Sequence, residues 1–470
     1  MYICVYICIY ICLFVAIVTH RGVQLKENRQ SLLTCSVVYL LQELSCTGNT
    51  IPIDTAEITK VQRFTFIAPE CMLKDLLTPF PNINPAFQLH NNDERFPSRG
   101  DMSLWTEYRD LRGPGMPSWY NLRTVLNKRM LHPKESVQYG DVVNEVVSDL
   151  IKRIYHLRRT SPTGDRVNNL SNELYRFSLE GISSILFETR IGCLEEEIPV
   201  ETQHFIDSIA QMFSYSLPVA MLPKWSRNIL PFYGRYIAGW EGIFKFCEFF
   251  RIRHSVHFCT SQGFKSIGLE FEGEYLTYLL SNTKMTNKEV YGSVAELLLA
   301  GVDTTSNTMM WAMYLLSRDS NVQNTLYQEV SRCIPGDNIP SAQDVNCMPY
   351  LKAVIKETLR MYPVVPLNSR IMAEKDVIIG GHFFPKKTSF TMCHYAISQD
   401  EKTFPEPSKF KPERWLRDGR VRPNPFGSIP FGFGVRGCVG RRIAELEMYL
   451  ALSRVRAVYR YIALHYFNQQ

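Results

Sequence analysis

Apolar residues recur at intervals of three and four along the middle of the chain, a spacing that predicts amphipathic helices. Helical patterns dominate from about Asp141 to Ile252 and are clearest at residues 141–158 (DVVNEVVSDLIKRIYHLR) and 172–190 (NELYRFSLEGISSILFETR). Residues 291–318 (YGSVAELLLAGVDTTSNTMMWAMYLLSR) are nearly all apolar. A helix that is apolar on all sides is buried, so this segment is predicted to be the central helix.

The pattern changes in the last quarter of the chain. Residues 350–363 (YLKAVIKETLRMYP) predict a shorter helix that Pro363 stops. Residues 375–398 alternate β-branched and aromatic side chains around glycine and proline, which predicts short strands and turns. Residues 441–455 (RRIAELEMYLALSRV) return to a helical pattern. The chain is therefore expected to be mainly α with a small β part, in one domain over residues 67–470.

Composition narrows the possible functions. The hydrophobic fraction of 45% allows a large core, and no Gly/Ser-rich or Pro-rich linker divides the chain. The net charge of +6 comes without a dense basic run, which argues against a nucleic-acid partner. The 13 cysteines form no paired CxxC motifs, which argues against structural zinc.

The N-terminus stays unassigned over residues 1–66, where periodicity is weak. Residues 1–18 (MYICVYICIYICLFVAIV) are apolar, uncharged and barely long enough to span a bilayer. A membrane anchor, an uncleaved signal and a misassigned start of the chain remain open. The positive charge of a signal peptide is absent, and so is an Arg-rich transit peptide.

One cysteine lies in an unusual frame, PFGFGVRGCVGRR, at residues 430–442. Its glycines allow a tight turn and close approach of a flat ligand. Turn amides and the start of the following helix are expected to favour the Cys438 thiolate. Neither further zinc ligands nor a basic partner for a nucleophile is visible nearby. An axial haem ligand fits, with Arg436 paired to a propionate; a buried free cysteine is the alternative.

An acid and two hydroxyls interrupt the central helix at residues 300–305 (AGVDTT). The Thr304 side chain is expected to bond the carbonyl of Ala300 and to open a groove. With the carboxylate of Asp303, such a groove could hold water and relay protons. The alternative is a hydrogen-bonded threonine beside a solvent-facing aspartate.

Charged side chains form two further patterns on the predicted helix at residues 350–363. Glu357 and Arg360 are three residues apart, and Arg414 in FKPERW could complete a buried network with them. A surface ion pair is the alternative. Lys352 and Lys356 lie on a different face of the same helix, either as a solvated pair or as a docking patch for an acidic partner.

These motifs together resemble those of the cytochrome P-450 family, the thiolate-haem monooxygenases. The order is W-x-x-x-R (Trp119, Arg123), A-G-x-D-T-T, E-x-x-R, F-x-P-E-R-W and F-x-x-G-x-R-x-C-x-G. More narrowly, segments such as FPSRGDMSLW, RIGCL, YPVVPLNSRI and GRRIAELEM resemble the mitochondrial sterol 27-hydroxylases (sterol 26-hydroxylases) of animals. The similarity runs from about Phe96 to about Val455.

The resemblance implies a cofactor and a role for each matching residue. Haem b would be bound through the thiolate of Cys438, whose electron donation favours O–O cleavage. Thr304 and Asp303 would steer protons to the bound oxygen. Glu357, Arg360 and Arg414 would form a structural charge network. Four residues would hold the haem propionates: Trp119, Arg123, Arg370 and Arg436.

The resemblance also implies partners. O2 and a sterol would be the substrates. Electrons would come from NADPH through a reductase and a small acidic 2Fe–2S ferredoxin of the adrenodoxin type. The ferredoxin would dock on Lys352 and Lys356, helped by Arg441 and Arg442. The implied location is the matrix side of the mitochondrial inner membrane, with residues 222–232 (LPKWSRNILPF) in peripheral contact.

Three departures from the family pattern leave rival hypotheses. The presequence is missing, the loop before Trp119 (RGPGMP) is short, and the chain ends at Gln470 without the family's longer C-terminal sheet. The chain is therefore expected to be truncated. One rival is a microsomal enzyme in the endoplasmic reticulum, anchored by residues 1–18 and fed by a flavoprotein reductase. Another is a haem-binding product without catalytic activity.

Overall fold

The protein is described by a computed structural model. The described residues include most of the chain from residue 116 onward and two short segments before it. The apolar start, residues 222–229 and the C-terminal residues 459–470 lie outside the described residues, as does most of the loop before Trp119. Among the described residues, no helix combines the length and apolarity needed to cross a bilayer. The described ranges are 65–67, 84–85, 116–132, 137–162, 167, 169–221, 230–247, 275–281, 285, 287–336, 338–371, 376–379, 382–386, 388–417 and 423–458.

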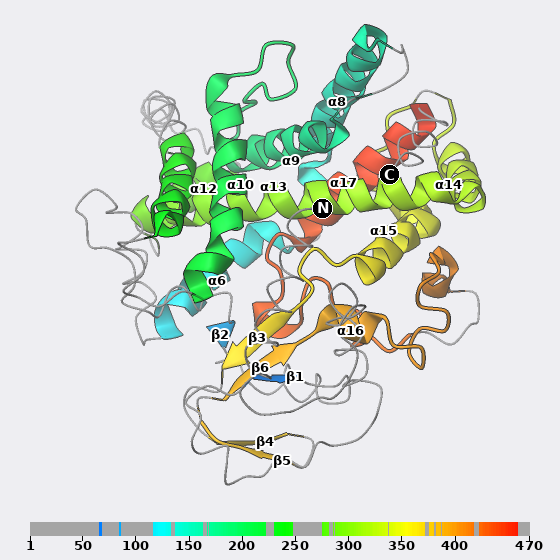
Figure 1. Cartoon of the computed structure of the whole chain (residues 1–470). Coiled ribbons are helices and arrows are strands. Elements are labelled where there is room, and N and C mark those ends of the chain that lie inside the picture. Colours follow the sequence, from blue (N-terminus) through cyan, green and yellow to red (C-terminus); the bar gives the residue numbers. More distant parts are fainter. Residues whose placement is uncertain are drawn as a thin grey trace.

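Helices make up most of the described structure, and α13 (Asn287–Arg318) runs through the middle of the molecule (Figure 1). Residues 231–247 are also helical. The other α-helices are α6 (Met116–Met130), α8 (Gly140–Thr160), α9 (Leu170–Leu186), α10 (Val200–Met221), α12 (Tyr275–Ser281), α14 (Ser320–Cys333), α15 (Pro349–Met361), α16 (His394–Ser398) and α17 (Arg441–Val458). Among the described residues, the 3-10 helices are η3 (Asp344–Cys347), η4 (Pro412–Trp415) and η5 (Gly434–Arg436).

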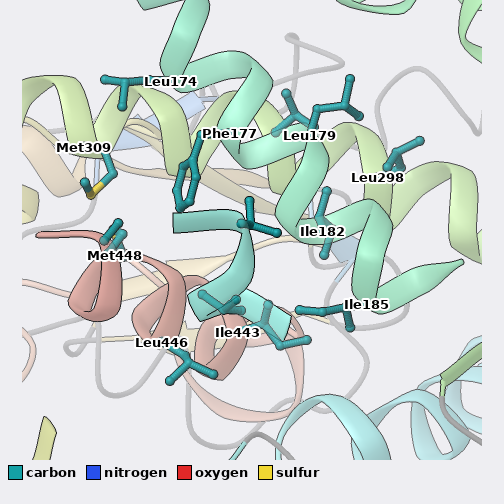
Figure 2. Packing of buried hydrophobic residues seen from close by; sticks show 14 of the residues in the cluster. Leu174, Phe177, Leu179, Ile182, Ile185, Leu298, Met309, Ile443, Leu446 and Met448 are labelled. Atoms are coloured by element: carbon teal, nitrogen blue, oxygen red, sulfur yellow. The ribbon is translucent and has the colours of Figure 1, made fainter. Parts of the chain in front are cut away.

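The core forms where α9, α13 and α17 pack together. Leu174 and Phe177 of α9 are fully buried, as is Met309 of α13. Figure 2 shows Phe177 and Met309 close to Met448 of α17. A side chain at Gly301 of α13 would place its Cβ 2.9 Å from Cγ1 of Ile182 on α9. The missing side chain at Gly301 therefore lets α9 and α13 approach closely, just before Asp303 and Thr304.

The strands form two small sheets at one end of the molecule (Figure 1). The first has four strands in the order β1–β6–β3–β2, in which β1 pairs parallel with β6 and the other pairs are antiparallel. The second is the antiparallel pair β4–β5. The strands are β1 (Thr65–Ile67), β2 (Asn84–Pro85), β3 (Asn368–Ile371), β4 (Val377–Ile379), β5 (His382–Phe384) and β6 (Ser389–Met392).

The mainly helical fold with a small β part is confirmed. The predicted helices correspond to α8, α9, α13, α15 and α17, and α13 begins about one turn before the expected start. The expectation for residues 394–398 was wrong, because strands and turns were predicted and the segment is the helix α16. Tertiary contacts explain the difference: the hydroxyl of Ser398 donates to the carbonyls of Arg360 and Tyr395, 2.7 and 2.8 Å away, which favours a helical turn docked on α15.

Candidate functional site

A glycine-rich loop holds Cys438 between η5 and the start of α17. The amide of Cys438 donates to the carbonyl of Phe431 at 2.7 Å, and the amide of Gly437 donates to that of Gly434 at 2.9 Å. Gly432 has a φ of 69°, in the left-handed region that favours glycine. The turn therefore requires glycine, and it fixes Cys438 a few residues before the start of α17.

The surroundings of the Cys438 sulfur combine opposing electrostatic effects. Burial raises the pKa of the thiol, whereas amide donors from Gly440 and Arg441 and the positive charges of Arg123 and Arg441 lower it. Burial has the larger effect, so the net shift is opposite to the expected preference for the thiolate. The side chain nevertheless keeps an exposed surface, unlike buried Cys193 and Cys247.

Arg123 of α6 contacts the cysteine loop from a distant part of the chain. Its Nη2 donates to the carbonyl of Gly437, and its Nε donates to Oδ1 of Asn127 at 2.7 Å. Burial lowers the pKa of the guanidinium, and the nearby Cys438 opposes this effect. One side chain thus ties α6 to the residue before the cysteine.

The structure describes only some of the other side chains expected at the haem propionates. Arg436 lies in η5, in the same loop as Cys438, and is half-buried. Trp119 belongs to α6, one turn before Arg123, and Arg370 belongs to β3, opposite Phe390 of β6. The side chains of Trp119 and Arg370 lie outside the described residues. Their roles stay predictions.

Asp303 and Thr304 of α13 form hydrogen bonds with different partners. The hydroxyl of Thr304 donates to the carbonyl of Ala300 at 2.7 Å, the expected bond. Asp303 is only 8% exposed, so the alternative of a solvent-facing aspartate is wrong. Its Oδ1 accepts hydrogen bonds from the hydroxyl of Tyr175 on α9 and, at 3.2 Å, from Nδ2 of Asn307. Burial raises the pKa of Asp303, and these two bonds act against the rise.

Glu357 lies at the centre of a buried charge network. It and Arg360 are both fully buried, so the alternative of a surface ion pair is wrong. Arg360 Nη2 lies 2.9 Å from Glu357 Oε1, and Arg414 Nε lies 3.1 Å from the same oxygen. The indole of Trp415 donates to Oε2 at 2.9 Å, and Arg360 Nη1 donates to the carbonyl of Ser398 at 2.8 Å. The network therefore fastens α15 to η4 and to α16.

A basic surface forms where α15 meets the start of α17. Burial lowers the pKa of Lys356, Glu445 opposes this, and the charges of Arg441 and Arg417 lower it further, so these side chains are close together. Arg441 Nε lies 3.0 Å from Glu445 Oε1. Lys352 is half-buried, with its Nζ 3.2 Å from Asn346 Oδ1, and Arg442 Nη1 lies 3.9 Å from Glu445 Oε2. We call Lys352, Lys356, Arg417, Arg441 and Arg442 the basic patch.

Three residues near these groups were missed by sequence reasoning. Asn307 follows Asp303 by one helical turn, and that spacing was a usable signal. Arg417 follows the FKPERW motif closely, but nothing in the sequence places it beside α15. Tyr175 is 128 positions away from Asp303. No local pattern marks such a contact.

Comparison with known proteins identifies relatives along most of the chain. The family model for cytochrome P-450 matches residues 91–460. Sterol 26-hydroxylase, mitochondrial, from Rattus norvegicus is 47% identical over 381 residues, which are 78% of this chain and 71% of the rat protein. The Homo sapiens protein of the same name is 45% identical over 389 residues, covering 80% and 72%.

A relative with a different name is also similar. The 25-hydroxyvitamin D-1 alpha hydroxylase, mitochondrial, of Homo sapiens is 40% identical over 370 residues, covering 76% of this chain and 72% of that protein. The family binds haem through a cysteine thiolate, and the Cys438 loop offers such a ligand. This chain belongs to the cytochrome P-450 family and is a monooxygenase, an oxidoreductase that uses molecular oxygen.

Proposed function

We propose that this protein is a mitochondrial monooxygenase that inserts one oxygen atom from O2 into the side chain of a sterol. The names and high identity of the mitochondrial sterol 26-hydroxylases support this substrate class. The observation that carries the chemistry is the Cys438 loop, with an exposed cysteine residue and two backbone amides that donate to its sulfur. We take residues 67–470 as one monooxygenase domain.

The residues around Cys438 fit a haem, which we propose is haem b with Cys438 as its axial ligand. Two amides that donate to one sulfur and the positive charges of two nearby arginines stabilise a thiolate, and a bound metal ion removes the thiol proton outright. Arg123 and Arg436 would pair with the propionates, and Trp119 and Arg370 would complete that set. When bound, the haem supplies the oxygen and one-electron chemistry.

Thr304 and Asp303 would carry protons to the oxygen. The Thr304 hydroxyl uses its own proton in the bond to Ala300, so its lone pairs are free to accept a hydrogen bond from a water. Burial raises the pKa of the Asp303 carboxyl above its ordinary value, which makes the group easier to protonate than an exposed aspartate. Glu357, Arg360 and Arg414 take no part in the reaction and hold the fold around it.

The basic patch would dock an acidic 2Fe–2S ferredoxin that an NADPH-dependent reductase reduces. Opposite charge guides such encounters and sets their orientation. The patch includes Arg441, whose backbone amide donates to the Cys438 sulfur, so docking occurs close to the proposed iron ligand. The positions of Lys352 and Lys356 match the ferredoxin-docking lysines of the mitochondrial branch of the family. We therefore propose that the protein lies on the matrix side of the mitochondrial inner membrane, with residues 222–232 in peripheral contact with it.

The difference spectrum of the reduced protein with carbon monoxide tests the ligand. The wild-type protein should show the signal of thiolate-bound haem, and Cys438→His should abolish it. An unchanged thiolate signal in Cys438→His would show that another cysteine binds the iron.

The substrate and electron donor need a second experiment. Cholesterol and related sterols are incubated with NADPH and either ferredoxin plus its reductase or a microsomal flavoprotein reductase, and hydroxylated products are measured by mass spectrometry. We expect product only with the ferredoxin. Product with the flavoprotein alone would favour a microsomal enzyme, and a normal spectrum without any product would favour an inactive haem protein.

A further inference from the structure

The hydroxyl of Tyr175 on α9 contacts the carboxylate of Asp303 on α13, near Gly301, where the two helices approach each other closely. The Tyr175 hydroxyl donates to Oδ1 of Asp303. Asn307 Nδ2 donates to the backbone carbonyl of Asp303 at 2.8 Å, and it lies 3.1 Å from the Tyr175 hydroxyl oxygen and 3.2 Å from Oδ1 of Asp303. The three polar groups form a closed triangle between the two helices. We propose that Tyr175 is a positioning residue, which orients the Asp303 carboxylate for proton delivery; this inference rests on the proposed role of Asp303.

The direction of each hydrogen bond in the triangle is fixed by chemistry. An amide NH2 can only donate, so the Tyr175 oxygen accepts from Asn307. The single phenolic proton is then directed to the carboxylate of Asp303. A hydroxyl that accepts one bond donates a stronger one, because hydrogen bonds in a chain polarise one another. Tyr175 is therefore a better donor to Asp303 than an isolated phenol.

The triangle also distinguishes the two carboxylate oxygens. Both hydrogen bonds to the Asp303 side chain end on Oδ1, and Oδ2 has no hydrogen-bond partner among the residues that the structure describes. Because successive residues of a helix are rotated by about 100°, Asp303 lies toward α9 while Thr304 lies on a different side of α13. With Oδ1 held by α9, Oδ2 is the oxygen available to exchange a proton with water on the Thr304 side.

The energetic consequence follows from burial. Burial favours the neutral acid at Asp303, and the bond from Tyr175 is the larger of the two side-chain contributions that oppose this. Without that hydroxyl, the carboxyl is freer to rotate and loses its strongest donor. Proton delivery should then fail more often, and oxygen should leave as hydrogen peroxide.

The test compares Tyr175→Phe with the matched control Tyr275→Phe. Tyr275 is also a buried tyrosine, but its hydroxyl has no hydrogen-bond partner among the described residues. With cholesterol, NADPH, ferredoxin and its reductase, Tyr175→Phe should lower kcat about tenfold, the factor expected for one charge-assisted hydrogen bond. Hydrogen peroxide formed per NADPH should rise, while the KM for cholesterol and the carbon monoxide spectrum stay as in the wild type. Tyr275→Phe should change none of these values.

A second readout needs no turnover. Urea unfolding midpoints are measured for Tyr175→Phe, Asp303→Asn and the double variant. The midpoint loss in Tyr175→Phe should shrink when Asp303 is already Asn, because a hydrogen bond to a neutral amide oxygen is weaker than one to a carboxylate. Additive losses, or a Tyr175→Phe enzyme that behaves like Tyr275→Phe, would overturn the proposal.

The same variants separate this proposal from the proposed function. If Asp303→Asn keeps wild-type kcat and peroxide yield, the role of Asp303 in proton delivery is wrong, and the positioning role of Tyr175 is wrong with it. If Asp303→Asn is impaired but Tyr175→Phe is not, only the positioning role is wrong.

Discussion

Glu447 of α17 carries a carboxyl group in a site with little to stabilise its charge. The residue is 1% exposed, and its Oε1 has no hydrogen-bond partner among the described residues. A side chain at Gly181 of α9 would place its Cβ 2.5 Å from that oxygen, so the carboxyl lies directly against the backbone of α9. Burial raises its pKa from the ordinary 4.5 to about 8.

This shift makes the stability of the fold depend on pH. The folded chain keeps the proton up to about pH 8, whereas the unfolded chain releases it near pH 4.5. The contribution of Glu447 is therefore intact below pH 4.5 and is lost as the pH rises to about 8. At about 1.36 kcal/mol per unit of pKa, the loss reaches about 5 kcal/mol.

Replacing Glu447 with glutamine removes the titration and keeps the shape. We expect Glu447→Gln to gain stability over the wild type as the pH rises from 6 to 8.5, measured as urea unfolding midpoints. The control Glu201→Gln neutralises an exposed carboxylate of α10 and should follow the wild-type profile. Parallel profiles for wild type and Glu447→Gln would refute the reasoning, because they would show that Glu447 finds a partner or reaches water.

Three other substitutions test the network, the anchoring of α15 and the basic patch. Glu357→Gln leaves the buried guanidinium of Arg360 without its counter-charge and should cost about 3–5 kcal/mol of unfolding free energy; a smaller loss in urea titrations would contradict the network. Glu329 accepts from the amides of Tyr350 and Leu351, both at 2.8 Å, at the first turn of α15, so Glu329→Ala should cost about 1–2 kcal/mol. Lys356→Glu replaces an attraction to the acidic ferredoxin with a repulsion and should raise the KM for ferredoxin about tenfold. An unchanged KM would show that Lys356 does not contribute to the proposed docking surface.

The sequence predicted the helical framework and the loop around Cys438 because both depend on local patterns. The apolar run at residues 291–318 can only be buried, and the glycines beside Cys438 permit turns that other residues resist. The bond from Thr304 to Ala300 was predictable for the same reason, since both groups lie within one helical turn.

Contacts between distant segments could not be predicted in this way. The spacing of Glu357 and Arg360 is the same in a surface pair and in a buried one, and only the packing of η4 and α16 decides between them. The donor to Asp303 comes from a different helix, and the sequence gives no reason to choose Tyr175 over other tyrosines. For the Cys438 thiol, the sequence predicted the amides that lower its pKa but neither the charge of Arg123 from α6 nor the burial that outweighs these effects.

The first turn of α17 contributes both to the electrostatics of the Cys438 sulfur and to the charge of the basic patch. Arg441 directs its amide to the sulfur of Cys438 and its guanidinium to Glu445 at the protein surface. A change that frays this turn would weaken the hydrogen bond from the Arg441 amide to the sulfur and displace a cation that we propose attracts the electron donor. We therefore expect the reduction potential of a haem bound to Cys438 and the affinity for the electron donor to vary together among variants of this turn. Neither property can be adjusted there without altering the other.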